Sequence, residues 1–436
     1  MSIYRNLVLA LLTFLLVTTV LPAAAEYFIV SNPTSTPSRQ SPIANPQSPV
    51  ALLEQGKQRY DAGRFAEAAQ LWEQAAKAFE QRKELRNQAV SHNYLAIVYQ
   101  DLGQWDAARD AIAQVLNLLQ TTDDPFLHAQ ILNTQGSFQL NTGHAEAALE
   151  TWKQAEERYR SLKDVTGIVL SQINQAQALQ TLGLYRRART TLEQVNQDLA
   201  TVPDSLIKAR ELRSLGVTLQ VVGDLQQSQA ILSESLAIAR RLNSAPDIGE
   251  TLFRLGNTAR AMEDFKAALE FYQEAKDTAT NSYTQLEANL NQLSLLVKTE
   301  QTQAVQALLP KIQASLADLP PSRTLIYAQV NFAESMMNMG NWKLGIGSRE
   351  LAQLLARAVR QAKELNDSRA ESYALGQLGH LYEQTQQESE ALSLTNQALA
   401  LAQGIRAADI AATWHWQQGR ILKAQGNVTE AIASYD

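Results

Sequence analysis

Small and apolar residues recur along this chain with a period of 40 residues. The most regular of them is a glycine that occupies five successive equivalent positions: Gly63, Gly103, Gly143, Gly183 and Gly223. A second row of very small residues lies seven positions earlier: Gly56, Ala96, Gly136, Ala176, Gly216 and Gly256. A fixed period of this length is typical of proteins built from stacked copies of one supersecondary unit.

Larger apolar residues and alanines follow each glycine of the first row at constant distances. In the first repeat these residues are Phe65, Ala68, Trp72 and Ala75. Steps of three and four residues place them on one face of a helix. The small residue before the glycine lies on another helix, so the pattern predicts two helices per repeat with the glycine in the turn between them. Such a turn needs a left-handed backbone, which glycine adopts at little cost.

The small residue on the first helix of each pair allows the second helix to approach closely. One helical hairpin of this kind cannot bury its apolar face alone, so successive hairpins must stack on one another. The sequence therefore predicts an all-α array.

These positions resemble the tetratricopeptide repeat family over nearly the whole chain after residue 48. The resemblance implies a right-handed superhelical α-solenoid of about ten helix-turn-helix repeats. The family's usual period is 34 residues, so the 40-residue period implies longer helices. Glu263 replaces the turn glycine in the sixth repeat, whose turn should therefore close differently. Pro310 in the seventh repeat predicts a kink or an early helix end.

The repeats divide the chain into residues 49–320, which hold repeats one to seven, and residues 321–436, which hold repeats eight to ten. The last repeat is truncated at Asp436. Residues 26–48 are rich in proline and serine, and such a composition predicts a disordered linker.

Residues 1–25 have the pattern of a secretory signal peptide. A basic residue, Arg5, precedes an apolar run from Leu7 to Val20, and small residues follow up to Ala25. The sequence thus predicts cleavage near Ala25 and export to the periplasm or the exterior, with only transient membrane contact. An uncleaved anchor is the alternative, but the apolar run is shorter than the roughly 20 residues that span a bilayer.

Composition narrows the classes of partner and chemistry. The net charge of −6, from 38 basic and 44 acidic residues, opposes the cationic surface that nucleic-acid binding requires. The chain has no cysteine, which removes disulfides, thiolate metal sites and cysteine nucleophiles. Its histidines are scattered over different repeats: His92, His128, His144, His380 and His415. We find no catalytic motif and predict no enzyme activity, metal or cofactor.

The resemblance to the repeat family also implies where a peptide or a partner protein binds. In that family, positions six and three residues before the small residue, and one and four after it, face the groove lined by the first helices. The predicted peptide-binding residues at these positions are Asn93, Asn133, Gln177, Arg210, Arg213, Phe253, Asn257 and Arg260. Asparagine and glutamine offer donors and acceptors to a peptide backbone. The arginines could bind a carboxylate in bidentate fashion, or they could simply pair with Glu250 and its neighbours.

The whole arrangement is similar to the N-terminal repeat arrays of cyanobacterial proteins that carry a caspase-like CHAT domain. This resemblance implies an alternative function, in which the array regulates a C-terminal protease domain. No residue of such a domain lies in this sequence. The leading prediction is an exported protein–protein interaction scaffold.

Overall fold

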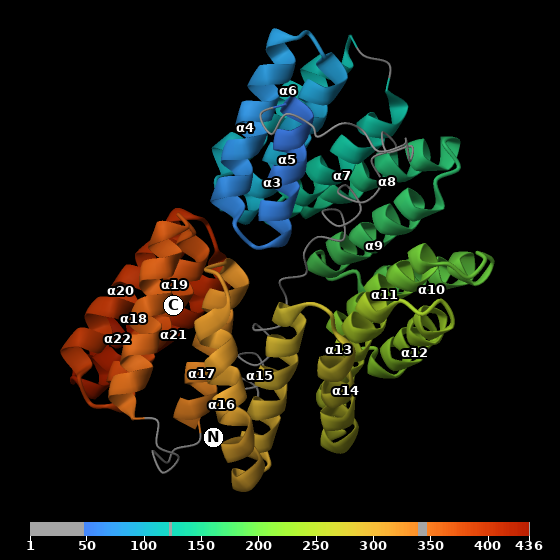
Figure 1. Cartoon of the computed structure of the whole chain (residues 1–436). Helices are drawn as coiled ribbons and strands as arrows, with labels where there is room; N and C mark the ends of the chain where they lie inside the picture. The colour runs from blue at the N-terminus through green and yellow to red at the C-terminus, as the bar shows by residue number, and fades with distance from the viewer. Residues whose placement is uncertain (1–47, 122–123, 339–346, 436) are drawn as a thin grey trace. The chain divides into compact units, whose positions relative to one another are not determined.

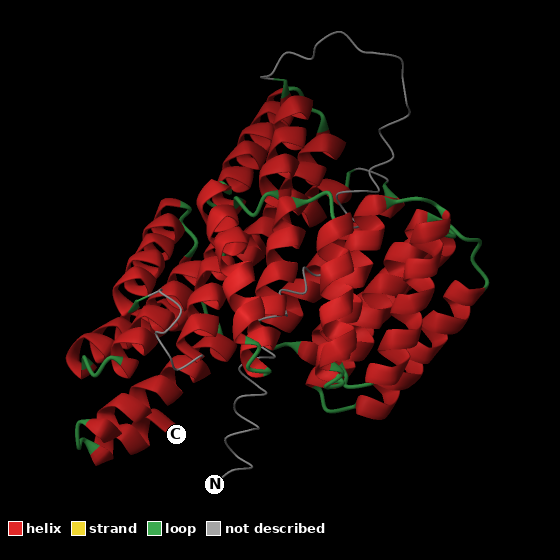
Figure 2. Ribbon diagram, turned by 60° about the horizontal axis from the view of Figure 1, so that its bottom comes forward, coloured by secondary structure: helices red, strands yellow, loops and turns green. Residues whose placement is uncertain are grey.

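The structure is a computed structural model that describes residues 48–121, 124–338 and 347–435. These residues form twenty α-helices and no strand (Figures 1 and 2). The helices follow one another as ten consecutive pairs, and the prediction of an all-α repeat solenoid is confirmed. The predicted signal peptide and almost all of the predicted linker lie outside the described residues.

In the first five pairs the helices are α3 (Pro49–Asp61), α4 (Phe65–Gln81), α5 (Leu85–Asp101), α6 (Trp105–Leu119), α7 (Pro125–Asn141), α8 (Ala145–Ser161), α9 (Val165–Thr181), α10 (Tyr185–Ala200), α11 (Leu206–Val221) and α12 (Leu225–Arg241). In the second five pairs they are α13 (Ala245–Ala261), α14 (Phe265–Thr278), α15 (Ser282–Lys298), α16 (Thr302–Asp318), α17 (Arg323–Asn338), α18 (Ser348–Glu364), α19 (Ser368–Gln384), α20 (Glu388–Gly404), α21 (Ala408–Ala424) and α22 (Val428–Tyr435).

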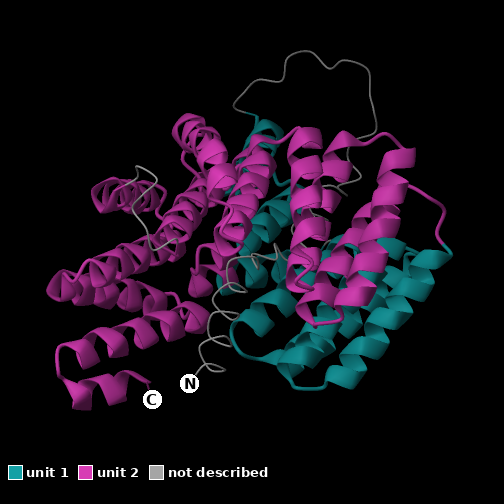
Figure 3. Cartoon of the chain, turned by 90° about the horizontal axis from the view of Figure 1, so that it is seen from below, with its two compact units in different colours: residues 1–57, 72–97, 109–201 teal, residues 58–71, 98–108, 202–436 magenta. Residues whose placement is uncertain are grey.

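The chain forms two compact units (Figure 3). Unit 1 consists of residues 1–57, 72–97 and 109–201, and in it α7, α8, α9 and α10 each pack on the next. Unit 2 consists of residues 58–71, 98–108 and 202–436, and in it every helix from α11 to α22 packs on its successor. Two short segments of the first two repeats thus belong to unit 2.

The turn glycines adopt the predicted left-handed backbone. Gly143, for example, has a φ of +86°, and its N–H donates to the carbonyl oxygen of Leu140 at 3.0 Å. Glu263 has a φ of +60° and repeats this bond by donating to the Arg260 oxygen at 3.1 Å. The expectation of a different closure there is therefore wrong. An L-residue adopts this conformation at a cost of roughly 1–2 kcal/mol. The packing of the surrounding helices offsets that cost.

In the first, third, fifth, sixth and tenth hairpins, the small residue of the first helix lies directly under a large residue of the second. A Cβ added to Gly136 would stand 2.5 Å from Nε1 of Trp152, and one added to Gly256 would stand 2.5 Å from Cε1 of Tyr272. The indole of Trp152 also donates to the backbone oxygen of Asn133 at 3.1 Å. The small row is therefore a packing requirement set by the partner aromatic ring.

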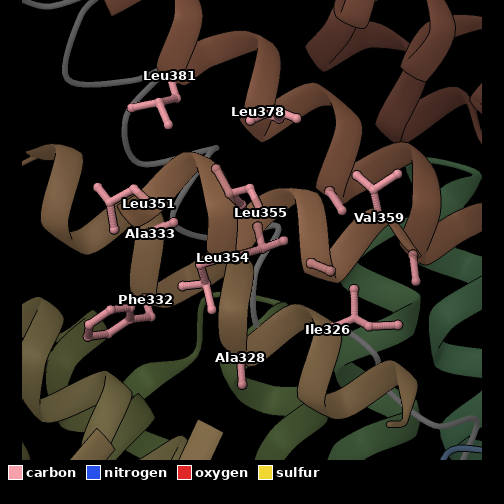
Figure 4. Packing of buried hydrophobic residues seen from close by; sticks show 14 of the residues in the cluster. Ile326, Ala328, Phe332, Ala333, Leu351, Leu354, Leu355, Val359, Leu378 and Leu381 are labelled. Carbon is pink, nitrogen blue, oxygen red and sulfur yellow. The ribbon is translucent and has the colours of Figure 1, made fainter. Parts of the chain in front are cut away.

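Buried apolar side chains continue from one hairpin to the next. In unit 2 one such cluster extends from α15 to α21, and Figure 4 shows part of it, with Phe332 of α17, Leu355 of α18 and Leu378 of α19 among its members. Within this region Pro310 is exposed, and α16 continues through it from Thr302 to Asp318. The early helix end that Pro310 predicted does not occur.

Candidate binding surface on the first helices

The first helices of successive repeats contact one another and bring equivalent positions together. In unit 2 these contacts join α11, α13, α15, α17, α19 and α21 in order, and in unit 1 they join α7 and α9. Four positions on each first helix form what we call the register row. They lie six and three residues before the small residue of that helix, and one and four residues after it. All eight residues predicted to bind a peptide belong to this row.

The three asparagines of the row are buried in the repeat stack. Asn93, Asn133 and Asn257 are 1%, 0% and 1% exposed. Each carboxamide oxygen accepts a hydrogen bond from a neighbouring helix: from Thr134 Oγ1 at 2.9 Å, from Ser171 Oγ at 3.2 Å and from Tyr272 OH at 2.8 Å, respectively. A ligand would reach these side chains only if their neighbours moved. Their contact with a ligand stays a prediction.

Asn257 nevertheless retains an unused hydrogen-bond donor. Its oxygen accepts from both Tyr272 and Asn291, whereas its Nδ2 is buried and has no acceptor. Asn174 Nδ2, two positions before the small residue of α9, is in the same state. Leaving such a group unpaired costs roughly 1–3 kcal/mol, and buried polar groups nearly always have partners. Both amides could therefore donate to a carbonyl oxygen brought in by a ligand.

The predicted cationic spot contains a carboxylate that the sequence prediction did not include. Asp247, 3% exposed, accepts from Arg210 Nε at 2.9 Å, from Arg213 Nη1 at 3.2 Å and from Ser244 Oγ at 2.7 Å. Burial alone would raise the pKa of Asp247, but the hydrogen bonds from Arg210 and Ser244 and the charge of Arg213 outweigh it and hold the pKa at about 2. The carboxylate is therefore ionised at neutral pH, and for Arg210 and Arg213 the alternative of pairing with an acidic neighbour holds.

The remaining predicted residues differ in accessibility. Phe253 is buried, with its ring centroid 6.0 Å from that of Tyr272. Gln177 and Arg260 are half-buried, and Arg260 Nη1 lies 3.5 Å from Asn291 Oδ1. The side chain of Arg210 is 41% exposed. Gln177, Arg210 and Arg260 are thus the predicted residues with the most surface to offer a ligand.

Two acidic residues of the register row were missed because the sequence reasoning stopped at the sixth repeat. Glu287 of α15 stands six positions before Leu293, and Glu334 of α17 stands one position after Ala333. Burial raises the pKa of both carboxyls to about 7, and the nearby charge of Glu250 adds to the shift at Glu287. The spacing from Gly256 to Leu293 is 37 residues, so the 40-residue period alone would not have found them.

Other kinds of site find little support in the part of the chain that the structure describes. No three His, Asp or Glu side chains there are grouped so as to hold a metal ion. None of the described helices is long and apolar enough to cross a membrane. What the first helices present is a row of amides, arginines and carboxylates suited to hydrogen bonding.

The fold and this surface define an all-α solenoid of helical hairpins with a polar row on its first helices. Residues 209–281, from α11 into the turn after α14, match a model of the tetratricopeptide repeat family. The predicted resemblance is thereby confirmed for the fifth and sixth repeats. No curated protein matches the chain.

Several solved structures are similar in fold. BtubC (BKLC) from P. vanneervenii is 20% identical, with a TM-score of 0.38 over 52% of this chain and 91% of that one. A Rap protein in complex with Competence and Sporulation Factor is 12% identical, with a TM-score of 0.42 over 82% and 98%. The quorum sensor NprR from B. thuringiensis, in its apo form, is 14% identical, with a TM-score of 0.43 over 73% and 87%.

Proposed function

We propose that this chain is a protein–protein interaction scaffold that binds an extended peptide, or an extended segment of a partner domain, along the register row. The observation that carries the proposal is the buried Nδ2 of Asn257, a donor without an acceptor on a first helix. A peptide carbonyl that reached this donor after a shift of the neighbouring side chains would satisfy it and recover its desolvation cost. The half-buried Arg260 and Asn291 lie beside it and supply further polar contacts.

The amide-rich row favours a peptide backbone over a single charged group. Asn and Gln side chains carry both donors and acceptors, which match the alternating N–H and C=O groups of an extended chain. The arginines at positions 210 and 213 share the carboxylate of Asp247, which already uses part of their hydrogen-bonding capacity. We therefore assign the backbone, and not a terminal carboxylate, as the main determinant of binding in α11 and α13.

A displayed library of random peptides provides the test, because the natural ligand need not be known. Peptides selected on the full chain are measured against wild-type protein by fluorescence anisotropy. We expect Arg260→Glu to weaken binding about tenfold, which corresponds to roughly 1.4 kcal/mol. Asn257→Asp removes the donor but keeps an oxygen for Tyr272, and it should weaken binding by a similar factor.

The control is Arg357→Glu, which reverses an exposed arginine of α18, outside the first helices. This variant should bind the selected peptides as wild type does. Far-UV circular dichroism checks that all three variants remain folded. If the library yields no binder, or if the Arg260 and Arg357 variants bind alike, the register row is not the binding surface.

We further propose that the protein is exported after cleavage near Ala25. The basic, apolar and small-residue order of residues 1–25 supports this proposal. Intact-mass measurement of protein recovered from the exterior or the periplasm is expected to show a chain that begins at Glu26. A recovered mass that still includes residues 1–25 contradicts cleavage.

An alternative proposal is that the array recognises a signal and regulates a CHAT protease domain in the same polypeptide. The exposed apolar residues of the last helix pair favour a partner there: Val428, Ile432 and Tyr435 are 57%, 56% and 41% exposed. Sequencing the gene beyond the codon for Asp436 discriminates the two readings. A continuation with a catalytic His and Cys supports the alternative, whereas a stop codon or an unrelated continuation removes it.

A further inference from the structure

The turns of the first two repeats have contacts that equivalent turns lack. A Cβ added to Gly143, Gly183 or Gly223 would meet nothing within 4 Å. One added to Gly63 would lie 3.4 Å from the backbone nitrogen of Arg323, and one added to Gly103 would lie 2.7 Å from Cβ of Ile405. Residues 58–71 and 98–108 accordingly belong to unit 2, together with α17 and the turn between α20 and α21 (Figure 3).

The first of these contacts centres on Arg323, the first residue of α17. Its backbone N–H donates to the Gly63 oxygen at 3.2 Å, and its guanidinium lies 4.4 Å from the centroid of the Phe65 ring. Its Nη2 donates to the backbone oxygen of Asp101 at 2.7 Å, across 222 positions of sequence. The Asp101 carboxylate in turn accepts from Tyr60 OH at 2.6 Å. Both turns are thus joined to one side chain that is 6% exposed.

The second contact lies between the turn after α5 and the turn after α20. Trp105 Nε1 donates to the backbone oxygen of Ile405 at 2.6 Å. The absence of a side chain at Gly103 lets the Ile405 side chain approach the backbone directly. This contact shares no residue with the first, but both involve the turn after α5, so we expect them to form and open together.

Part of the Arg323 environment is an ordinary feature of the repeat. Arg323 forms a bidentate pair with Asp367, at 2.5 and 2.9 Å, and Asp367 also caps α19. Arg86 forms the equivalent pair with Asp124, which caps α7. Unlike Arg86, Arg323 also bonds to the turns of the first two repeats. The ion pair with Asp367 is therefore a usual feature of the repeat, and the bonds to the turns are additional to it.

We propose that residues 58–71 and 98–108 form a clasp on the start of α17 and on the α20–α21 turn, all within unit 2, and that this clasp closes and opens reversibly. In a repeat array each repeat ordinarily contacts only its neighbours. A contact across 222 positions therefore joins segments of unit 2 that would otherwise move independently.

The chemistry of the clasp suits a reversible device. It consists of a few hydrogen bonds to backbone oxygens and one guanidinium over an aromatic ring, and typical net contributions of such bonds are roughly 0.5–1.5 kcal/mol each. The buried pair with Asp367 persists whether the clasp is open or closed, because both partners lie in the C-terminal repeats.

Cross-linking tests the clasp in the full chain. The sequence contains no cysteine, so Gln104→Cys and Arg406→Cys, both at exposed positions beside the second contact, introduce the only two thiols. A short bismaleimide at low protein concentration should link them within one chain, which mass spectrometry and gel mobility detect. We expect Trp105→Ala and Arg323→Ala, each added to this background, to reduce the intramolecular yield at least threefold.

Arg86→Ala is the matched control, because it removes the equivalent ion pair of the second repeat without touching the clasp. Its cross-linking yield should equal that of the parent. Hydrogen exchange gives a second readout: the Arg323 amide, unprotected in an ordinary first turn, should exchange slowly in wild type and rapidly in the Trp105 variant. No cross-link in the parent, or equal yields in the parent, Trp105 and Arg323 variants, overturns the proposal. If Arg323→Ala fails to fold, the Trp105 variant decides alone.

Discussion

Replacing Gly136 with alanine tests whether the small row is a packing requirement. An added Cβ would stand 2.5 Å from Nε1 of Trp152. Carbon atoms in favourable contact lie about 3.5–4.0 Å apart. Trp152 is 1% exposed, so the ring cannot swing into solvent to make room. The substitution therefore forces either the indole or the α7 backbone to shift.

Two opposing effects set the magnitude. Alanine is favoured over glycine in a helix interior by about 1 kcal/mol. Overpacking a dense core costs roughly 1–3 kcal/mol, and displacement of the indole also weakens its bond to the Asn133 oxygen, worth about 1 kcal/mol. We expect the cost of overpacking to exceed the gain in helix propensity, with a net destabilisation of about 1–3 kcal/mol.

Urea unfolding followed by far-UV circular dichroism measures the effect as a lower midpoint. The control is Gly404→Ala in the last turn of α20, where an added Cβ meets no heavy atom within 4 Å, so the midpoint should stay equal or rise slightly. Combining Gly136→Ala with Trp152→Leu reproduces the pairing of the fourth repeat, Ala176 with Leu192, and should cost less than the sum of the single changes. A Gly136→Ala protein as stable as the Gly404 control refutes the reasoning.

Three further changes test individual contacts. Glu263→Gly should stabilise the sixth repeat by about 0.5–1 kcal/mol, because glycine adopts a φ of +60° without strain, and a higher melting temperature is the readout. The raised pKa of Glu287, about 7, keeps its side chain protonated in the folded chain below that pH, so the wild-type free energy of unfolding should fall as pH rises from the unfolded pKa through about 7. The free energy of unfolding of Glu287→Gln should therefore match that of wild type near pH 5 and exceed it by about 1–2 kcal/mol near pH 8. Asp247→Asn leaves two arginines without their carboxylate and should cost about 2–4 kcal/mol at neutral pH. That cost should shrink as pH falls through about 2, where wild-type Asp247 itself becomes protonated; a cost independent of pH contradicts the ion-pair explanation.

Much of the fold could be predicted from residue spacing because the interactions that specify it are local. A turn glycine such as Gly143 acts through its own φ and through bonds to residues three to five positions away. The small residue and the ring above it lie 16 positions apart in one hairpin, as Gly136 and Trp152 do. The prediction failed at Glu263 because the neighbouring helices impose the left-handed turn even on an unfavourable side chain.

The candidate surface was predicted less completely, since periodicity gives the face of a helix but not what covers it. The register placed Asn257 and Arg260 in the correct row, yet it could not show that Asn257 is 1% exposed. The pairing of Arg213 with Asp247 depends on two helices of successive repeats coming together. The two acidic residues Glu287 and Glu334 could not be placed by the 40-residue period, because Leu293 follows Gly256 after only 37 residues.

The sequence by itself determined the helical hairpin, its length and its repetition, because glycine backbone freedom and close packing at fixed spacings act over a few turns of chain. Only the tertiary structure decided which charges cancel, which amides are left without partners, and that the turns of the first two repeats contact Arg323 and Ile405. These outcomes depend on distances between side chains 34 to 300 positions apart, and no local pattern encodes such distances.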